Sequence, residues 1–116
     1  MVAINFSAQF AGPVERGEKL QTIRHKVRCK PGDALQLYTG MRTKACRKLR
    51  DAVCSAVVPV SITRGTLEVG GSVYMSDTAA AFARADGFKD YTEMWQWFED
   101  RYAAPRFTGH VIQWDV

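Results

Sequence analysis

The sequence predicts an α+β fold, a small mixed or barrel-like sheet with its helices packed on one side. Apolar residues alternate at period two near both ends of the chain, which indicates a strand at each end, and two helical patterns come late in the chain. Strand–helix–strand repetition is absent, as are the phosphate-binding motifs GxGxxG and GxxxxGK[ST], which argues against a doubly wound fold. A length of 116 residues fits one domain spanning residues 1–116.

In the first half of the chain, turn residues separate stretches with the period-two pattern of half-buried strands. Pro13 suits the first position of a short helix, and Gly17 suits its end. The sequence KPGD at residues 30–33 predicts a turn. The expected elements are a strand over residues 4–8, a helix over 13–16, a strand beginning at 21 with Ile23 and Val27 inward, and a strand over 34–39.

In the second half, helix caps and a proline define the expected boundaries. Ser76 or Asp77 is the expected cap of one helix, and Asp90 with Glu93 has the spacing of a capping box for the next. The expected elements are a polar, basic connection over 39–51, a buried strand over 52–62 broken or bulged at Pro59, one or two short strands within 63–75, helices over 76–86 and 90–102, and a closing strand over 108–116. The aromatic stripe of the last helix, with Trp97 off it and half exposed, is expected in the core: Tyr91, Met94, Trp95, Phe98 and Tyr102.

Charge is distributed unevenly along the chain. The net charge is +4, yet residues 16–50 hold eleven cations and two anions, whereas residues 51–116 hold five cations and nine anions. A basic front half of this kind is typical of a surface that faces phosphates. The alternative is a solvated basic face with no partner.

The stretch GEKLQTIR, residues 17–24, contains three polar side chains that can face one cavity. Lys19 follows the turn at Gly17, and Thr22 and Arg24 share one face of the next strand by period two. Together they can hold a carbonyl or phosphate oxygen. With Arg24 and Lys26 nearby, partial burial would lower the pKa of Lys19 toward that of a base able to activate water or the Thr22 hydroxyl, whereas a neighbouring carboxylate would keep Lys19 charged. The alternative is that these are surface charges and an ordinary strand threonine.

GEKLQTIR resembles the GxKxxTxR signature of the ASCH superfamily. The KPGD turn before an apolar strand is similar to the KxGD turn of that family, and ADGF at 85–88, followed by an aromatic helix and a strand ending near Trp114, also matches. The resemblance covers nearly the whole chain. It implies a small PUA-like β-barrel with two to three helices packed around it, a cleft beside Lys19, and ligands that are RNA, nucleotides or nucleosides.

The resemblance also implies possible enzymatic activities. One bacterial branch hydrolyses the amide of N(4)-acetylcytidine with a lysine, a threonine and a glutamate, and another member of the superfamily is reported as a ribonuclease. Lys19 and Thr22 match the first two residues, and the third falls on Asp86, which is one methylene shorter than glutamate. Lys19, Thr22 and Asp86 are therefore the expected catalytic residues, with no metal or other cofactor.

A second basic stretch, residues 37–50, is longer and more basic than the matching segment of the amidohydrolase branch. An aromatic ring at a strand end can stack on a base, and the arginines and lysines that follow can track a phosphate chain. The alternative is a flexible solvated loop. The expected nucleic-acid or substrate contacts are Arg24, Lys26, Tyr38, Thr39, Arg42, Lys44 and Arg47.

Three classes of function remain open on the sequence. The first is a binding domain for RNA, a nucleotide or a nucleoside, the second is the hydrolase, and the third is an interaction module whose basic surface meets an acidic protein. An odd count of three cysteines without a CxxC pair favours a reduced, cytoplasmic setting, and no Cys/His cluster suggests structural zinc. No stretch is apolar enough to predict a signal peptide or a membrane span.

Overall fold

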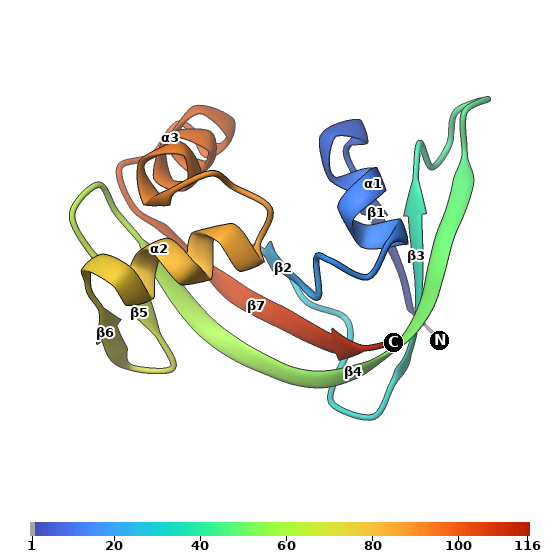
Figure 1. Cartoon of the computed structure of the whole chain (residues 1–116), viewed down its shortest axis with the longest axis horizontal. Helices are drawn as coiled ribbons and strands as arrows, with labels where there is room; N and C mark the ends of the chain where they lie inside the picture. Colours follow the sequence, from blue (N-terminus) through green and yellow to red (C-terminus); the bar gives the residue numbers. More distant parts are fainter. Residues whose placement is uncertain (1) are drawn as a thin grey trace.

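The computed structural model describes residues 2–116, within which three helices accompany a mixed sheet of seven strands (Figure 1). This confirms the α+β class. The elements, in chain order, are β1 (Val2–Phe6), α1 (Ala8–Glu15), β2 (Gln21–Arg24), β3 (Ala34–Thr39), β4 (Arg47–Ile62), β5 (Leu67–Val69), β6 (Ser72–Tyr74), α2 (Ser76–Ala85), α3 (Tyr91–Tyr102) and β7 (Phe107–Asp115).

The long strand β4 organises the sheet. Its first part pairs antiparallel with β3, and its second part pairs antiparallel with β7 and, at its end, with β5. Strand β1 extends the β3 side as a parallel neighbour, and β2 extends the β7 side as an antiparallel one. Figure 1 shows β4 and β7 as a curved pair, with α1 and α3 over opposite ends of the same side.

The two ends of this curled sheet, β1 and β2, share no backbone ladder within residues 2–116. Arg24 Nη2 instead donates to the main-chain oxygen of Asn5 at 2.7 Å, so one side chain joins the two strands. The sheet is therefore open at this seam, and the expected closed barrel is not formed by main-chain pairing. The physical reason is that β2 is only four residues long and pairs with β7 alone.

Strand β4 is longer than expected, because the segment 47–51 belongs to it and the basic connection covers only residues 40–46. Pro59 does not break the strand; the irregularity lies between Cys54 and Ala56. The carbonyl of Pro59 accepts from Gly70 N at 2.8 Å, just beyond the last β4–β5 pair. Since the nitrogen and carbonyl of a strand residue face the same edge, the missing N–H of proline falls where the ladder already ends.

Helix α1 also differs from expectation, because it begins at Ala8 and contains Pro13 rather than starting there. The Ser7 side chain makes no capping hydrogen bond, so the start carries no strong local signal. Burial of Phe10, Ala11 and Val14 against the sheet stabilises the helix instead.

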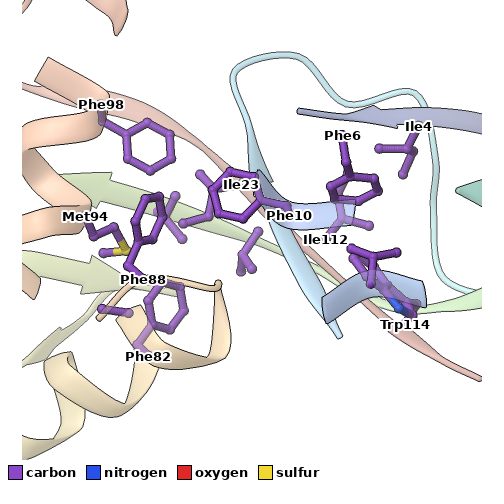
Figure 2. Close-up of a cluster of buried hydrophobic side chains, with 14 of the residues drawn as sticks. Ile4, Phe6, Phe10, Ile23, Phe82, Phe88, Met94, Phe98, Ile112 and Trp114 are labelled. Carbon is purple, nitrogen blue, oxygen red and sulfur yellow. The ribbon is translucent and has the colours of Figure 1, made fainter. Parts of the chain in front are cut away.

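The core joins the two ends of the sheet (Figure 2). Phe6 packs edge-on against Trp114 at one end, and Met94 and Phe98 from α3 are buried at the other. Phe10 lies between them in this view. Of the predicted α3 stripe, Met94 and Phe98 are buried and the others are partly exposed. No helix in the part of the chain that the structure describes is long and apolar enough to cross a membrane.

Candidate functional site

A cavity of about 180 Å³ lies where α1, β2, the segment after α2, and α3 meet. The polar side chains that line it are Asn5, Ser7, Lys19, Thr22, Arg24, Asp86 and Arg101. Its aromatic lining comes from Phe6, Phe10, Phe88, Trp97, Phe98 and Tyr102. Lys19, Thr22 and Asp86 are at most 5% exposed, so they form the floor of the cavity.

The turn after α1 places Lys19 on this floor. The carbonyl of Pro13 accepts from the main-chain nitrogens of both Glu18 and Lys19, at 2.9 and 3.0 Å, and Gly17 takes a φ of 76°. The Lys19 ammonium then lies 5.0 Å from the centre of the Phe10 ring, within the range of a cation–π contact. Proline in the last turn of α1 and the glycine that follows it thus fix where the lysine points.

Asp86, at the end of α2, is the partner of Lys19. Lys19 Nζ donates to the main-chain oxygen of Asp86 at 2.5 Å and lies 3.4 Å from its Oδ1. Gln21 Nε2 donates to the same Oδ1 at 3.4 Å. Gly87 follows with φ 98°, and a Cβ there would lie 3.0 Å from the Phe10 ring, so only glycine allows this turn to approach α1 so closely. The structure brings Asp86 and Lys19 together although 67 residues separate them in the sequence.

Burial shifts the pKa values of Lys19 and Asp86 in the directions that favour the neutral amine and the neutral carboxylic acid. Burial lowers the pKa of Lys19, and the Asp86 carboxylate opposes that change. Burial raises the pKa of Asp86, opposed first by Lys19 and then by the hydrogen bond from Gln21. Of the two causes expected to lower the pKa of Lys19, burial is the larger, and repulsion from Arg24 adds to it. A buried amine beside a buried carboxyl group, each shifted in this direction, is an arrangement that general acid–base chemistry uses.

Thr22 and Arg24 lie beside the pair on one face of β2, as their period-two spacing predicts. Arg24 Nε donates to Thr22 Oγ1 at 3.2 Å, and the Arg24 guanidinium lies 5.1 Å from the centre of the Phe6 ring. Since the Thr22 oxygen accepts this bond, its own proton is available to a ligand or a base. Within residues 2–116, Thr22 and Lys19 share no direct hydrogen bond.

The other predicted contact residues do not line this cavity. Lys26 lines a separate surface hollow of about 150 Å³ at the open seam, which shares Asn5 and Arg24 with the main cavity. Tyr38 and Thr39 are half-buried on β3, and Thr39 Oγ1 donates to the Phe6 carbonyl at 2.8 Å.

Three further predicted contacts lie in or beside the connection between β3 and β4. Arg42 and Lys44 are exposed in this connection. Arg47, at the start of β4, forms an ion pair with Glu15 of α1, with Nη1 2.6 Å from Oε2. The second basic stretch is therefore a surface feature separate from the cavity.

Sequence reasoning missed the aromatic lining and Arg101. Trp97 is half-buried, as expected, but its contacts with Phe10 and Phe88 at the cavity were not predicted. Phe88 is the last residue of the ADGF segment that resembles the ASCH superfamily. No local pattern marks Phe10 or Arg101, because their relation to the cavity depends on how α1 and α3 pack.

No protein-family model matches this chain, and comparisons with curated proteins and with solved structures give no match. Of the residues through which the sequence resembles the ASCH superfamily, Lys19, Thr22, Arg24 and Asp86 line the cavity, whereas Gly17 and the KPGD turn do not. The chemistry of this cavity is therefore the basis for a functional proposal.

Proposed function

We propose that the protein is a nucleic-acid-directed, ASCH-type domain of PUA-like fold that binds RNA, a nucleotide or a nucleoside, with one base held in the cavity beside Lys19, Thr22 and Arg24. The observation that supports this most strongly is that one cavity combines a polar floor with aromatic walls. An unpaired base is complementary to such a cavity, because its edge carries hydrogen-bond donors and acceptors and its flat surface is aromatic.

The size and lining of the cavity favour a single base over a duplex. About 180 Å³ between α1, β2 and α3 accommodates one ring system. Thr22 and Asp86 on the floor offer a hydroxyl and a carboxylate to a base edge, while Phe10 and Trp97 offer aromatic contacts at the sides. Base–aromatic contacts contribute about 1–3 kcal/mol per base.

Binding can be followed by calorimetry or by a change in tryptophan fluorescence, to which Trp97 at the cavity contributes, with the four ribonucleosides and a short single-stranded RNA as ligands. Thr22→Val keeps the shape of the side chain and removes its hydroxyl, so we expect base affinity to fall by about tenfold. Thr92→Val, at an exposed position of α3, is the matched control and should change nothing. Absence of saturable binding to every one of these ligands would reject the proposal, and shortened RNA after incubation would point to a ribonuclease.

A longer RNA should also contact the exposed cations outside the cavity. Lys26, Arg42 and Lys44 are exposed, and contacts with phosphate release bound counterions. If about six cations meet phosphates, raising salt from 50 to 200 mM should weaken RNA binding by more than tenfold. A nucleoside carries no phosphate, so its affinity should be nearly flat over the same range. A flat response for RNA would remove these cations from the binding surface.

A second candidate is an amidohydrolase that cleaves the N(4)-acyl amide of a modified cytidine, and the buried Lys19–Asp86 pair favours it. A neutral Lys19 amine can take a proton from water or from the Thr22 hydroxyl as the oxygen attacks the amide carbon. The resulting ammonium can then return that proton to the departing amine nitrogen as the C–N bond breaks. Attack by water releases acetate directly, whereas attack by Thr22 leaves an acetyl ester that a water molecule then hydrolyses. The main-chain oxygen of Asp86 accepts a hydrogen bond from Lys19 and so holds it in place. The Asp86 carboxylate, 3.4 Å from Lys19 Nζ, stabilises the ammonium form of Lys19.

Release of acetate from N(4)-acetylcytidine tests this second candidate. Lys19→Met keeps the apolar stem and removes the amine, so turnover should be lost, whereas Lys30→Met, at an exposed position before β3, should retain it. Circular dichroism shows whether each variant is folded. Undiminished turnover by Lys19→Met would exclude Lys19 from the reaction, and no turnover by the unmodified protein would exclude this activity.

A further inference from the structure

The cavity carries more positive charge than its floor requires. Three cations line it, Lys19, Arg24 and Arg101, against one carboxylate, Asp86. Lys19 and Asp86 neutralise each other at the floor. Arg24 and Arg101 therefore leave an excess of two positive charges on the cavity, which a neutral nucleoside does not need.

The Arg24 guanidinium is held in place by hydrogen bonds, but not all of its N–H donors are used. Its Nε donates to Thr22 Oγ1 at 3.2 Å and its Nη2 to the Asn5 carbonyl at 2.7 Å, and both acceptors are neutral groups. Nη1 makes no hydrogen bond to any of the residues 2–116. The N–H groups of Nη1 are thus free for a ligand, on a side chain whose orientation is already fixed.

Arg101 faces the same cavity from the last turn of α3. Its guanidinium lies 5.1 Å from the centre of the Trp97 ring, which positions it without neutralising its charge. Arg101 forms no ion pair with the neighbouring Asp100 or with any other carboxylate within residues 2–116, and Glu99 of the same helix pairs with Arg64 at 2.9 Å. Repulsion from Arg101 contributes to a lowered pKa of Arg24, although burial is the main cause and Asp86 opposes it. Both arginines line the same cavity, which is the geometric basis for assigning them a common ligand.

We propose that Arg24 and Arg101 form an anion subsite at the mouth of the cavity that binds the phosphate group of the ligand whose base occupies the floor. Guanidinium groups recognise phosphate through paired N–H donors, and two of them flanking one anion relieve their own repulsion. Arg101 is exposed whereas Lys19 and Asp86 are buried, so the phosphate lies toward solvent and the base lies inside. This inference rests on the proposed function for the base, and it selects a nucleotide or a phosphate-bearing RNA residue over a free nucleoside.

The competing explanation is that Arg101 only stabilises the end of α3, where a cation interacts favourably with the helix dipole. Arg84 provides the matched control, because it also lies in the last turn of a helix, α2, and is exposed, yet it does not line the cavity. A helix-end effect would be equal for Arg84→Gln and Arg101→Gln, whereas a phosphate contact would be lost only in the latter.

The test is a calorimetric comparison of cytidine, 3′-CMP, 5′-CMP and inorganic phosphate on the full chain and the two variants. We expect one of the two nucleotides to bind about 10- to 100-fold more tightly than cytidine, and Arg101→Gln to remove most of that preference while changing cytidine affinity less than about twofold. Arg84→Gln should leave every affinity unchanged. Equal binding of cytidine and both nucleotides by the unmodified protein, or equal losses in the two variants, would overturn the subsite.

The two proposals can fail separately. If neither cytidine nor the nucleotides bind, the base-binding proposal fails for this base, and inorganic phosphate alone decides the subsite. Saturable phosphate binding that Arg101→Gln abolishes would support the subsite, and no phosphate binding would overturn it.

Discussion

Replacing Asp86 by asparagine should turn a buried ion pair into a buried, uncompensated ammonium with almost no change of shape. Asp86 is 4% exposed, and its Oδ1 lies 3.4 Å from Lys19 Nζ and 3.4 Å from Gln21 Nε2. The amide oxygen of asparagine can still accept from Gln21, and the main-chain oxygen that accepts from Lys19 at 2.5 Å is untouched. The substitution therefore isolates the carboxylate charge.

The expected cost follows from the burial of the pair. Removing one partner of a buried ion pair destabilises a protein by about 3–5 kcal/mol, because the remaining charge is left without compensation. The main-chain acceptor of Lys19 survives in Asp86→Asn, so we expect the lower end, about 3 kcal/mol at pH 7. A domain of this size unfolds with about 5–15 kcal/mol, so the variant should remain folded but be clearly less stable.

The pH dependence gives a second measure of the same effect. Burial lowers the pKa of Lys19 in the folded state, so between that pKa and the ordinary lysine value the unfolded chain binds more protons than the folded one. Stability in that interval therefore rises with pH and is lost as pH falls. Without Asp86 to oppose the lowering, the interval widens toward neutral pH, and the deficit of the variant should shrink as pH increases from 7 to 9, by at most about 1.4 kcal/mol per pH unit.

Urea unfolding monitored by circular dichroism at several pH values measures both quantities. Asp100→Asn, at an exposed position of α3, is the matched control and should change the free energy of unfolding by less than about 0.5 kcal/mol. A loss for Asp86→Asn as small as that of the control, or a loss that does not change with pH, would show that the carboxylate does not compensate Lys19.

Three further changes test the fold around the site. Gly109→Ala should cost about 3 kcal/mol or prevent folding, because a Cβ there would lie 2.4 Å from the main-chain oxygen of Arg24; wild-type stability would refute this packing. Tyr91→Phe should cost about 1–2 kcal/mol in urea unfolding, since the single proton of its hydroxyl is shared between the carbonyls of Thr63 and Thr66 in the β4–β5 turn. Burial raises the pKa of Tyr91 to about 12, so its spectroscopic titration should occur at higher pH than that of free tyrosine. Arg47→Ala should cost under about 1 kcal/mol, and less at high salt, because its pair with Glu15 is half exposed; a larger loss would mean that it does more than join α1 to β4.

Elements with local signals could be predicted from the sequence, and those that depend on distant partners could not. Strand β3 has the predicted bounds, and α3 begins as predicted because the Asp90 side chain accepts from Glu93 N at 2.8 Å. The start of β4 carries one buried apolar residue, Leu49, among charged ones, so only its pairing with β3 makes it a strand. The start of α1 likewise depends on burial rather than on a cap.

The candidate site divides in the same way. The convergence of Lys19, Thr22 and Arg24 could be predicted, because a turn and a period-two strand bring them together within eight residues of one another. The contact with Asp86 was suggested by resemblance, and its distances follow only from the packing of α2 against the β2 segment. The contribution of Arg101 required the orientation of α3, which no local pattern specifies.

The five lysines and arginines of residues 17–33 lie in three different environments, which explains how one short stretch can hold so many cations in a stable domain. Its first cation, Lys19, is buried and requires a carboxylate from elsewhere in the chain, which Asp86 supplies. Arg24 is half-buried and rests on neutral acceptors, so its charge remains available to a ligand. The last three, Lys26, Arg28 and Lys30, are exposed, where water and salt screen their repulsion. The basic run therefore consists of a buried cation, a half-buried cation and three exposed ones, and only Lys19 and Arg24 belong to the cavity.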